Sequence, residues 1–378
     1  MAITLKIGSP VEGNDFYGRE RELELALKRI QNNNLMLAAP RRVGKTSFAK
    51  MLLSQMRDCG WDGIFVDLEG LSDIPSFFKA IHQLLMEMPN VSRSQQVMNY
   101  MKSHMPNIDL SANIVGVEAK ISLARQMSDG FDNLLSILKE IGKPTVIILD
   151  EMTVFLEKLL NTEGDSLVKE FLDKFRALRQ MSCSNCRWLV ASSVGVRHFA
   201  SVHHVSETIN DFMDFPLGAF NDEEAMGLVS VLSESEGLDI NNTCAQYMLS
   251  KIGWNIPYFI QLMVSYITNE HITEQDIDAA YEDVLRTSAF ESWSERLTKE
   301  YGETEVIARK ILCQICLTPE GKTREDIEAL LDLNDFPMEQ FSTLLMTLEN
   351  DGYLAKDGTR RYFRSPLLRD YWKRKFCE

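Results

Sequence analysis

Residues 39–46, APRRVGKT, combine basic side chains, a glycine and a hydroxyl in an order that is typical of phosphate-binding loops. The apolar run from Leu35 to Leu37 predicts a strand before them, and SFAKMLLSQM predicts a helix after them. A loop in this position directs its backbone N–H groups toward an anion, and the dipole of the following helix adds partial positive charge. The run therefore predicts a site for the phosphates of a nucleotide.

The last residues of this loop carry most of the expected chemistry. Lys45 has the reach to bind the β- and γ-phosphates, and the hydroxyl of Thr46 is a ligand for Mg²⁺. Ala39 replaces the first glycine of the usual motif, which a residue with negative φ can do. The alternative is a chance match in an ordinary loop before a helix. The residues that we expect to contact ATP here are Pro40, Arg41, Arg42, Val43, Gly44, Lys45, Thr46 and Ser47.

A second motif, TVIILDE, spans residues 145–151 and ends a buried apolar run in two acids. Asp150 is placed to support a phosphate-bound Mg²⁺, and Glu151 is placed to polarise the attacking water as a general base. An acidic pair of this kind, taken alone, is more often a helix cap or a solvated strand edge. Together with the loop before it, the pair predicts ATP hydrolysis.

A third set of polar residues follows the apolar run WLVA. Ser192 or Ser193 is placed to sense the γ-phosphate or to orient water, with a plain strand-end turn as an equal alternative. We take Ser192 as the catalytic candidate. Arg197, just beyond, is in reach of a neighbouring subunit's phosphate, although a solvated loop arginine is the commoner case.

Short β-rich runs alternate with helical stretches over the first half of the chain, which predicts an α/β fold. We expect the three-layer sandwich of a P-loop NTPase with a five-stranded parallel sheet. The expected strands are residues 35–39, 63–68, 145–150, 188–192 and 211–217. Within the long segment after the second strand, residues 108–123 alternate loosely and predict an inserted strand or hairpin.

The pattern changes to helices after residue 217. A capping Asn221 opens one helix, and a capping box from Thr273 to Asp276 opens another. From about residue 303, three helices and a hairpin around Asp357 and Gly358 predict a winged helix. The expected domains are an N-terminal leader (1–14), a P-loop ATPase domain (15–217, with an insertion at about 92–125), a separate helical domain (218–300), which the resemblance described next implies to be a lid, and a winged-helix domain (301–378).

These motifs resemble those of archaeal and bacterial P-loop ATPases related to the signal-transduction ATPases with numerous domains (STAND), a branch near the AAA+ and origin-recognition ATPases. FYGRE at residues 16–20 is similar to the family's hydrophobic-hydrophobic-Gly-Arg-Glu motif. GWNIPY at residues 253–258 is similar to its Gly-x-Pro element, with two additional residues before the proline, and FRSPLLRDYW at residues 363–372 resembles the end of its winged helix. The resemblance covers nearly the whole chain.

The resemblance implies that Tyr17, Gly18 and Arg19 lie beside the adenine and the phosphates, and that Pro257 packs on the adenine. It also implies an ATP switch in which nucleotide changes assembly or domain packing and turnover is slow. From the residues alone, the first motif predicts only a turn that enters an amphipathic helix, and Pro257 predicts only a helix start.

The formal net charge of −15 disfavours nucleic acid as a partner. The third helix of the predicted winged helix, MEQFSTLLMTLEN, contains acids and no basic residue. Basic residues cluster instead in the wing and on the final helix: Lys356, Arg360, Arg361, Arg364, Arg369, Lys373, Arg374 and Lys375. We favour the interpretation that these charges pair with acidic residues of the lid and sheet domains. The alternative is a DNA-binding helper in replication or transposition that uses them to grip the DNA backbone.

The remaining composition predicts a cytoplasmic protein with reduced cysteines, because no apolar run approaches the ~20 residues of a membrane span and no signal peptide is evident. We interpret the CxxC pairs Cys183/Cys186 and Cys313/Cys316 as turn and core residues rather than metal ligands. The expected cofactors are ATP and Mg²⁺. The expected partner is another protein or a second copy of this chain.

Overall fold

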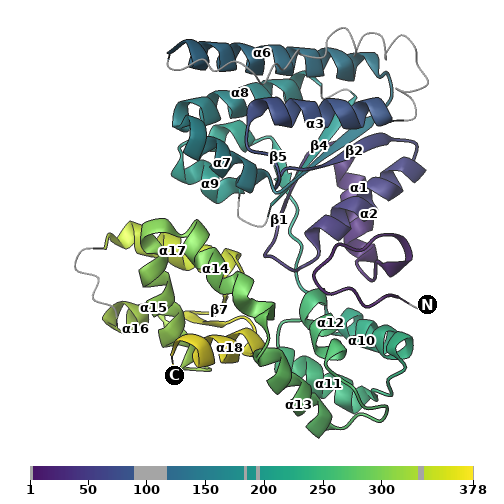
Figure 1. The fold of residues 1–378 in the computed structure, drawn as a ribbon, viewed down its shortest axis with the longest axis vertical. Helices are drawn as coiled ribbons and strands as arrows, with labels where there is room; N and C mark the ends of the chain where they lie inside the picture. Colours follow the sequence, from purple (N-terminus) through teal and green to yellow (C-terminus); the bar gives the residue numbers. More distant parts are fainter. Residues whose placement is uncertain (1–2, 89–116, 183–184, 193–195, 331–335, 378) are drawn as a thin grey trace. The chain divides into compact units, whose positions relative to one another are not determined.

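The computed structural model describes residues 3–88, 117–182, 185–192, 196–330 and 336–377 (Figure 1). They belong to two compact units. The sheet unit comprises Glu20–Ala39 and Lys45–Leu217, and the helical unit comprises Met1–Arg19, Pro40–Gly44 and Gly218–Glu378. The predicted phosphate loop is thus divided, since residues Pro40–Gly44 belong to the helical unit, whereas Ala39 and Lys45 belong to the sheet unit.

The sheet unit contains the predicted five-stranded parallel sheet. Its strands are β1 (Asn34–Ala38), β2 (Asp62–Asp67), β3 (Thr145–Asp150), β4 (Cys186–Ser192) and β5 (Phe212–Asp214). All neighbours pair in parallel, in the order β2-β3-β4-β1-β5. Each strand lies within a few residues of its expected position, and the sheet with its helices confirms the predicted P-loop NTPase fold class.

Helices cover both faces of this sheet (Figure 1). The strands alternate, so that Ile147 and Leu149 of β3 join the large core under one set of helices, whereas Val146 faces Leu53 of α2 on the other side. The first set is α3 (Ile74–Glu87), α6 (Val117–Glu140), α7 (Met152–Glu163), α8 (Asp165–Met181) and α9 (Val196–Val202), and the opposite set is α1 (Glu20–Ile30) and α2 (Lys45–Asp58). A 3₁₀ turn, η2 (Ser206–Ile209), leads into β5.

The expectation of an inserted strand is wrong in the described part of that segment. Residues 117–123 begin α6, and residues 108–116 lie outside the described residues. The physical reason is the period of the apolar side chains farther along, because Met127, Phe131, Leu134 and Leu138 recur every three or four residues and are all buried. One helical face continues back into the weakly alternating stretch.

The helical unit contains a 3₁₀ turn and, in the stretch predicted to be a lid, a set of helices whose ends carry the predicted caps; we name them the lid helices after that prediction. Asn221 and Glu224 form a reciprocal capping box, as do Thr273 and Asp276. The lid helices are α10 (Asp222–Glu236), α11 (Asn242–Ile252), α12 (Pro257–Ser265) and α13 (Glu274–Leu285). They are preceded by η1 (Gly13–Asp15) and followed by η3 (Ser288–Phe290), α14 (Glu291–Glu300) and η4 (Gly302–Thr304).

The C-terminal segment, residues 305–376, contains helices around a small antiparallel sheet. Its elements are α15 (Glu305–Cys316), β6 (Lys322–Thr323), α16 (Arg324–Leu330), α17 (Met338–Asn350), β7 (Leu354–Asp357), β8 (Arg360–Phe363) and α18 (Pro366–Phe376), with sheet order β6-β8-β7. Tyr353 and Trp372 are buried in its core. Its identification as a winged helix stays a prediction, as do the domain limits. Across the described part of the chain, every helix is too short or too polar to span a membrane.

Candidate functional site

The two predicted nucleotide motifs of the sheet unit meet through one hydrogen bond. Thr46, in the first turn of α2, donates its hydroxyl to Oδ2 of Asp150 at 2.7 Å, although the two residues are 104 positions apart. The other carboxylate oxygen of Asp150 accepts the N–H of Glu151 at 3.1 Å. A hydroxyl and a carboxylate side by side are oxygen ligands of the kind that Mg²⁺ takes. The residues present therefore fit the expected metal.

The Asp150 carboxyl is held almost out of water, with 3% of its surface exposed. Burial raises its pKa to about 6, against the opposing effect of the Thr46 hydrogen bond. A carboxylate in this position lacks the solvent that would stabilise its charge. A bound cation would supply that stabilisation.

Strand order places a third predicted residue at the same edge of the sheet. β4 lies between β1 and β3, and because all three are parallel, their carboxyl ends coincide, with Ala38 opposite Ser192. Ser192 is buried and donates its hydroxyl to Oγ1 of Thr153 at 2.8 Å. We did not anticipate Thr153. The sequence feature that could have identified Thr153 is its hydroxyl in the first helical turn directly after Glu151.

The predicted phosphate loop contains a buried lysine and a left-handed glycine. The ammonium group of Lys45 is buried and donates to the carbonyl of Ala39 at 2.8 Å, so it folds back across its own loop. Gly44 has φ of +97°, and no described atom lies within 4 Å of the position that a Cβ would take there. Ser47 is buried in the first turn of α2, and Val43 is buried within the loop. An open, left-handed glycine beside a lysine is what a phosphate cradle needs.

Backbone strain concentrates in the predicted motifs. Four non-glycine residues of the described chain have positive φ, and three of them, Arg19, Arg42 and Glu151, belong to those motifs; the fourth is His204. Glu151 has φ of 55° and ψ of 41° as the residue before α7. Such conformations cost roughly 1–2 kcal/mol and persist at sites where function requires them.

The residues expected around the adenine lie in the helical unit. The ring of Tyr17 meets that of Phe220 edge-on at 6.2 Å, and Gly18 is left-handed against the same ring. Arg19 donates to the carbonyls of Val43 at 3.1 Å and Gly218 at 2.8 Å, so its guanidinium binds backbone oxygens. The nucleotide contacts predicted for these residues stay predictions.

Three other predicted residues also belong to the helical unit. Pro257 is the first residue of α12. Pro40 lies close to Gly352 of the C-terminal segment, where a Cβ would be 3.0 Å away, and Arg41 is half-buried. Within the described chain, the sheet-unit candidates Lys45, Thr46 and Asp150 lie together at one edge of the sheet, where Thr46 is hydrogen-bonded to Asp150 and the charge of Lys45 acts on the same carboxyl.

Arg197 is used within its own chain. Its Nε donates to Asp214 at 2.7 Å and its Nη2 donates to the carbonyl of Phe212 at 3.0 Å. Both acceptors belong to β5, so this arginine fastens α9 to the edge strand. The ion pair is solvent-exposed and weak enough to exchange for another anion.

The basic residues of the C-terminal segment are largely bound within the helical unit. Arg361 pairs with Glu349 at 2.7 Å, Arg374 pairs with Glu282 of α13 at 2.8 Å, and Arg364 donates to backbone carbonyls of the same segment. Arg374 therefore pairs with the predicted lid, whereas Arg361 and Arg364 are bound within their own segment, so the lid pairing expected for the wing arginines is wrong for these two. We also expected pairing with the sheet domain, and these contacts do not test that expectation.

Two of the paired cysteines are interior residues. Cys316 is buried, Cys186 is buried as the first residue of β4 rather than in a turn, and Cys313 is half-buried, while Cys183 lies outside the described residues. In the described part of the chain, no group of three or more His, Cys, Asp or Glu side chains is arranged to hold a metal ion.

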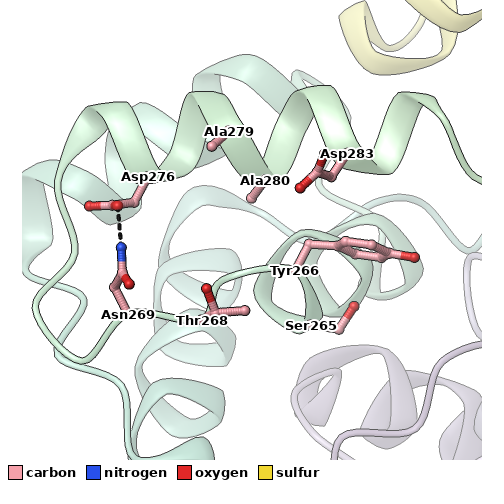
Figure 2. A pocket seen from close by; sticks show the side chains of 8 residues that line it. All are labelled: Ser265, Tyr266, Thr268, Asn269, Asp276, Ala279, Ala280 and Asp283. Atoms are coloured by element: carbon pink, nitrogen blue, oxygen red, sulfur yellow. Dashed lines mark hydrogen bonds between the residues drawn. The ribbon is translucent and has the colours of Figure 1, made fainter.

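A cavity of about 380 Å³ opens between α13 and the chain after α12 (Figure 2). Its carboxylate Asp276 accepts a hydrogen bond from Asn269 at 2.5 Å and also caps α13 through Thr273, and these bonds lower its pKa, those from Thr273 most. The lining residues are Ser265, Tyr266, Thr268, Asn269, Asp276, Ala279, Ala280 and Asp283. None of the predicted nucleotide residues is among them, so the cavity is a polar surface feature of the lid helices.

Comparison with solved structures identifies the fold. A Walker-type ATPase of Pyrococcus abyssi aligns with a TM-score of 0.64 and 16% sequence identity, over 98% of this chain and 99% of that chain. The ORC2 protein of Aeropyrum pernix, solved as ADPNP and ADP complexes, aligns with a TM-score of 0.56 and 12% identity, over 97% and 98% of the two chains. No protein-family model matches this chain, and no curated protein matches it. At these identities the likeness shows the fold alone, that of a P-loop NTPase.

Proposed function

We propose that this protein is an ATP-binding regulatory ATPase, a molecular switch of the STAND and AAA+ type. In this proposal ATP and Mg²⁺ bind at the carboxyl edge of the sheet, hydrolysis is slow, and the change of nucleotide alters domain packing or assembly with a protein partner. The observation that carries the proposal is the Thr46–Asp150 hydrogen bond, which joins two distant motifs and so supports a magnesium site beside Lys45.

The residues of the site divide the chemistry among them. Lys45 donates to phosphate oxygens in place of the Ala39 carbonyl, and Thr46 and Asp150 hold the cation. The cation, when bound, neutralises charge that develops on the β- and γ-phosphates. Glu151 accepts the proton of the attacking water, and the hydroxyl of Ser192 orients that water or the γ-phosphate.

The direct test separates binding from hydrolysis. Lys45→Ala removes the phosphate-binding ammonium group, so we expect ATP affinity to fall at least 100-fold in calorimetry. Glu151→Gln keeps the shape of the side chain but not its basicity, so we expect unchanged binding and a hydrolysis rate lowered at least 100-fold. Equal hydrolysis by Glu151→Gln and the parent protein would show that another group is the base.

Binding of DNA is the alternative that the charge distribution disfavours, because Arg361 and Arg374 are already paired with carboxylates. We expect no mobility shift of duplex DNA at low salt, with or without ATP. A salt-dependent shift that disappears in the double variant Lys356→Glu/Arg360→Glu, both exposed in the wing, would favour a DNA-binding helper instead.

A further inference from the structure

Arg42 occupies a strained position in the middle of the phosphate loop. Its φ is +68°, in the left-handed region where glycine is free of strain and other residues are not. Gly44, two residues later, also has a positive φ, and there the sequence has the residue that adopts it without strain. A side chain at this position therefore destabilises the loop unless the side chain makes a contact that offsets the strain.

The side chain of Arg42 makes that contact with a lid helix. Its guanidinium lies 4.3 Å from the ring centre of Tyr258, the second residue of α12. The tyrosine is 7% exposed, and its hydroxyl donates to the carbonyl of Ala289 at 3.2 Å. The ring is thus fixed from behind, and it presents its face to a cation in a nearly dry setting where cation–π attraction is strongest.

The N-terminal segment encloses this contact from a third side. A Cβ at Gly8 would stand 2.8 Å from Nη1 of Arg42 and 3.9 Å from the Tyr258 ring. Close by, the N–H of Lys6 donates to the side chain of Gln261 on α12 at 3.0 Å. Arg42 therefore lies between the N-terminal segment and α12.

The next residue of the loop is held by a second arginine. The guanidinium of Arg19 donates to the carbonyl of Val43 and to the carbonyl of Gly218, which starts the chain of the lid helices. Its plane lies over the ring of Phe220 at 4.7 Å, and the side chain is 2% exposed. Two successive loop residues are thus attached to the lid helices, one by its side chain and one by its carbonyl.

We propose that Arg42 and Arg19 are positioning residues that couple the phosphate loop to the lid helices, with the Arg42–Tyr258 contact as the link that responds to nucleotide. Phosphates draw the N–H groups of residues 42–44 toward them, and a rotation of those peptide units moves the Arg42 side chain and the Val43 carbonyl. Both are fixed to the lid helices, so the rotation changes how firmly α12 is held. This inference rests on the proposed function, since it requires a triphosphate at the loop.

The test measures hydrogen exchange of the backbone amides of α12 with and without saturating Mg²⁺-ATP, so that every variant is equally occupied. We expect a nucleotide-dependent change of exchange in the parent protein. In Arg42→Gly and in Tyr258→Leu that change should fall by at least half. Tyr258→Phe, the matched control that keeps the ring, should retain it. Arg42→Gly relieves the backbone strain, so a folding defect is not expected; if it does not fold, Tyr258→Leu measures the same link.

A double-mutant cycle on ATP affinity provides the second readout. Because coupling is reciprocal, Arg42→Gly and Tyr258→Leu should change the dissociation constant non-additively by at least fivefold. An unchanged exchange response in both variants, an additive cycle within twofold, or no response of α12 in a parent protein that binds ATP would each overturn the inference. Failure of the parent protein to bind ATP, with Lys45→Ala indistinguishable from it, would instead overturn the proposed function.

Discussion

Asp150 shows the cost of building a cation site into a folded chain. Its carboxylate is 3% exposed, and burial raises its pKa to about 6, so at neutral pH the folded protein holds a charge that water would hold better. The nearby hydroxyl of Thr46 offsets only part of that cost. A residue that weakens the fold in the absence of ligand is expected at a functional site.

The Asp150→Asn variant should therefore gain stability and lose function. An amide avoids the buried charge and still accepts from Thr46, while the Glu151 N–H loses its acceptor, so we expect the free energy of unfolding at pH 7 to rise by about 2 kcal/mol. Urea unfolding of the protein without nucleotide measures this. Mg²⁺-dependent ATP binding should fall in the same variant; a stability loss greater than 1 kcal/mol would contradict the charge argument.

His82 predicts a pH dependence of stability. It is 1% exposed in the core beside Phe78, neither ring nitrogen has a hydrogen-bond partner among the described residues, and burial lowers its pKa to about 4. The unfolded chain binds a proton below about pH 6.5 and the folded protein only below about 4, so stability is lost as pH falls through that window, by up to about 3 kcal/mol.

Unfolding free energies at pH 7 and pH 5 measure this effect. His82→Phe, which keeps a ring in the core, should flatten the difference attributable to this residue. His271→Gln is the control, because that side chain is 89% exposed and pairs only at the surface with Asp239. An equal pH dependence in His82→Phe and the parent protein would exclude His82 as its source.

Among the elements, the short edge strand β5 depends on a buried ion pair. Arg179 of α8 is fully buried between the rings of Phe175 and Phe212 and donates to both oxygens of Asp211 at 2.9 and 2.7 Å. Burial opposes the charge of Asp211, but the hydrogen bonds from Arg179 outweigh it and lower the pKa of that carboxyl. The stabilising contribution of this ion pair is therefore fully present above 3.8, the ordinary pKa of an Asp carboxyl, and is lost as the pH falls below that value.

Arg179→Met keeps the volume and removes the charge, which leaves Asp211 without its strongest partner. We expect the free energy of unfolding at pH 7 to fall by about 3–5 kcal/mol, measured by urea denaturation. Arg197→Met is the matched control, because that exposed arginine pairs with Asp214 of the same strand and should cost less than 1 kcal/mol. Similar losses in the two variants would show that burial is not what makes the Arg179 pair strong.

Helices α15 and α18 bring two thiols into contact. The sulfur atoms of Cys316 and Cys377 are 3.4 Å apart, and burial raises the pKa of Cys316, so its thiolate is scarce at neutral pH. We expect oxidised glutathione to link them slowly at pH 8, with release of two molecules of reduced glutathione. The link should close a loop of about 60 residues and stabilise the protein by up to about 4 kcal/mol.

Mass spectrometry of the oxidised protein identifies the linked peptides. Cys377→Ser should prevent the intramolecular link, and it is the variant of choice because Cys313 also contacts Cys377, whereas Cys59→Ser, which removes an exposed thiol of the sheet unit, should leave the link intact. Covalent dimers in place of the Cys316–Cys377 link would mean that α18 does not stay against α15 in solution.

For the whole molecule, nucleotide should act as a stabilising ligand. Binding to the folded protein alone raises the free energy of unfolding by about 2.7 kcal/mol at 100 times the dissociation constant. We expect Glu151→Gln, which retains the triphosphate, to show a higher melting temperature with Mg²⁺-ATP, and Lys45→Ala to show none of this shift. Light scattering on the same Glu151→Gln samples distinguishes assembly of several chains from a rearrangement within one chain.

Local patterns in the sequence determined the elements and the chemistry of the sheet edge. Apolar runs of five to seven residues placed the strands, and Asn221 and Thr273 marked helix starts, because strand burial and capping depend on residues within a few positions. The loop before Lys45 and the acids after residue 149 identified a nucleotide site, since phosphates and Mg²⁺ require those groups. The inserted strand failed in its described residues, 117–123, where the apolar spacing was weak and a long helix begins.

The tertiary structure decided which of these elements and side chains meet. The order β2-β3-β4-β1-β5 puts Ser192 between the two motifs, and only packing across the sheet selects that order. The Thr46–Asp150 bond and the contact of Arg42 with Tyr258 each join residues more than a hundred positions apart. The burial of Asp150 likewise depends on tertiary packing. Sequence spacing does not predict such contacts, because long-range packing and desolvation, rather than local propensity, set their free energies.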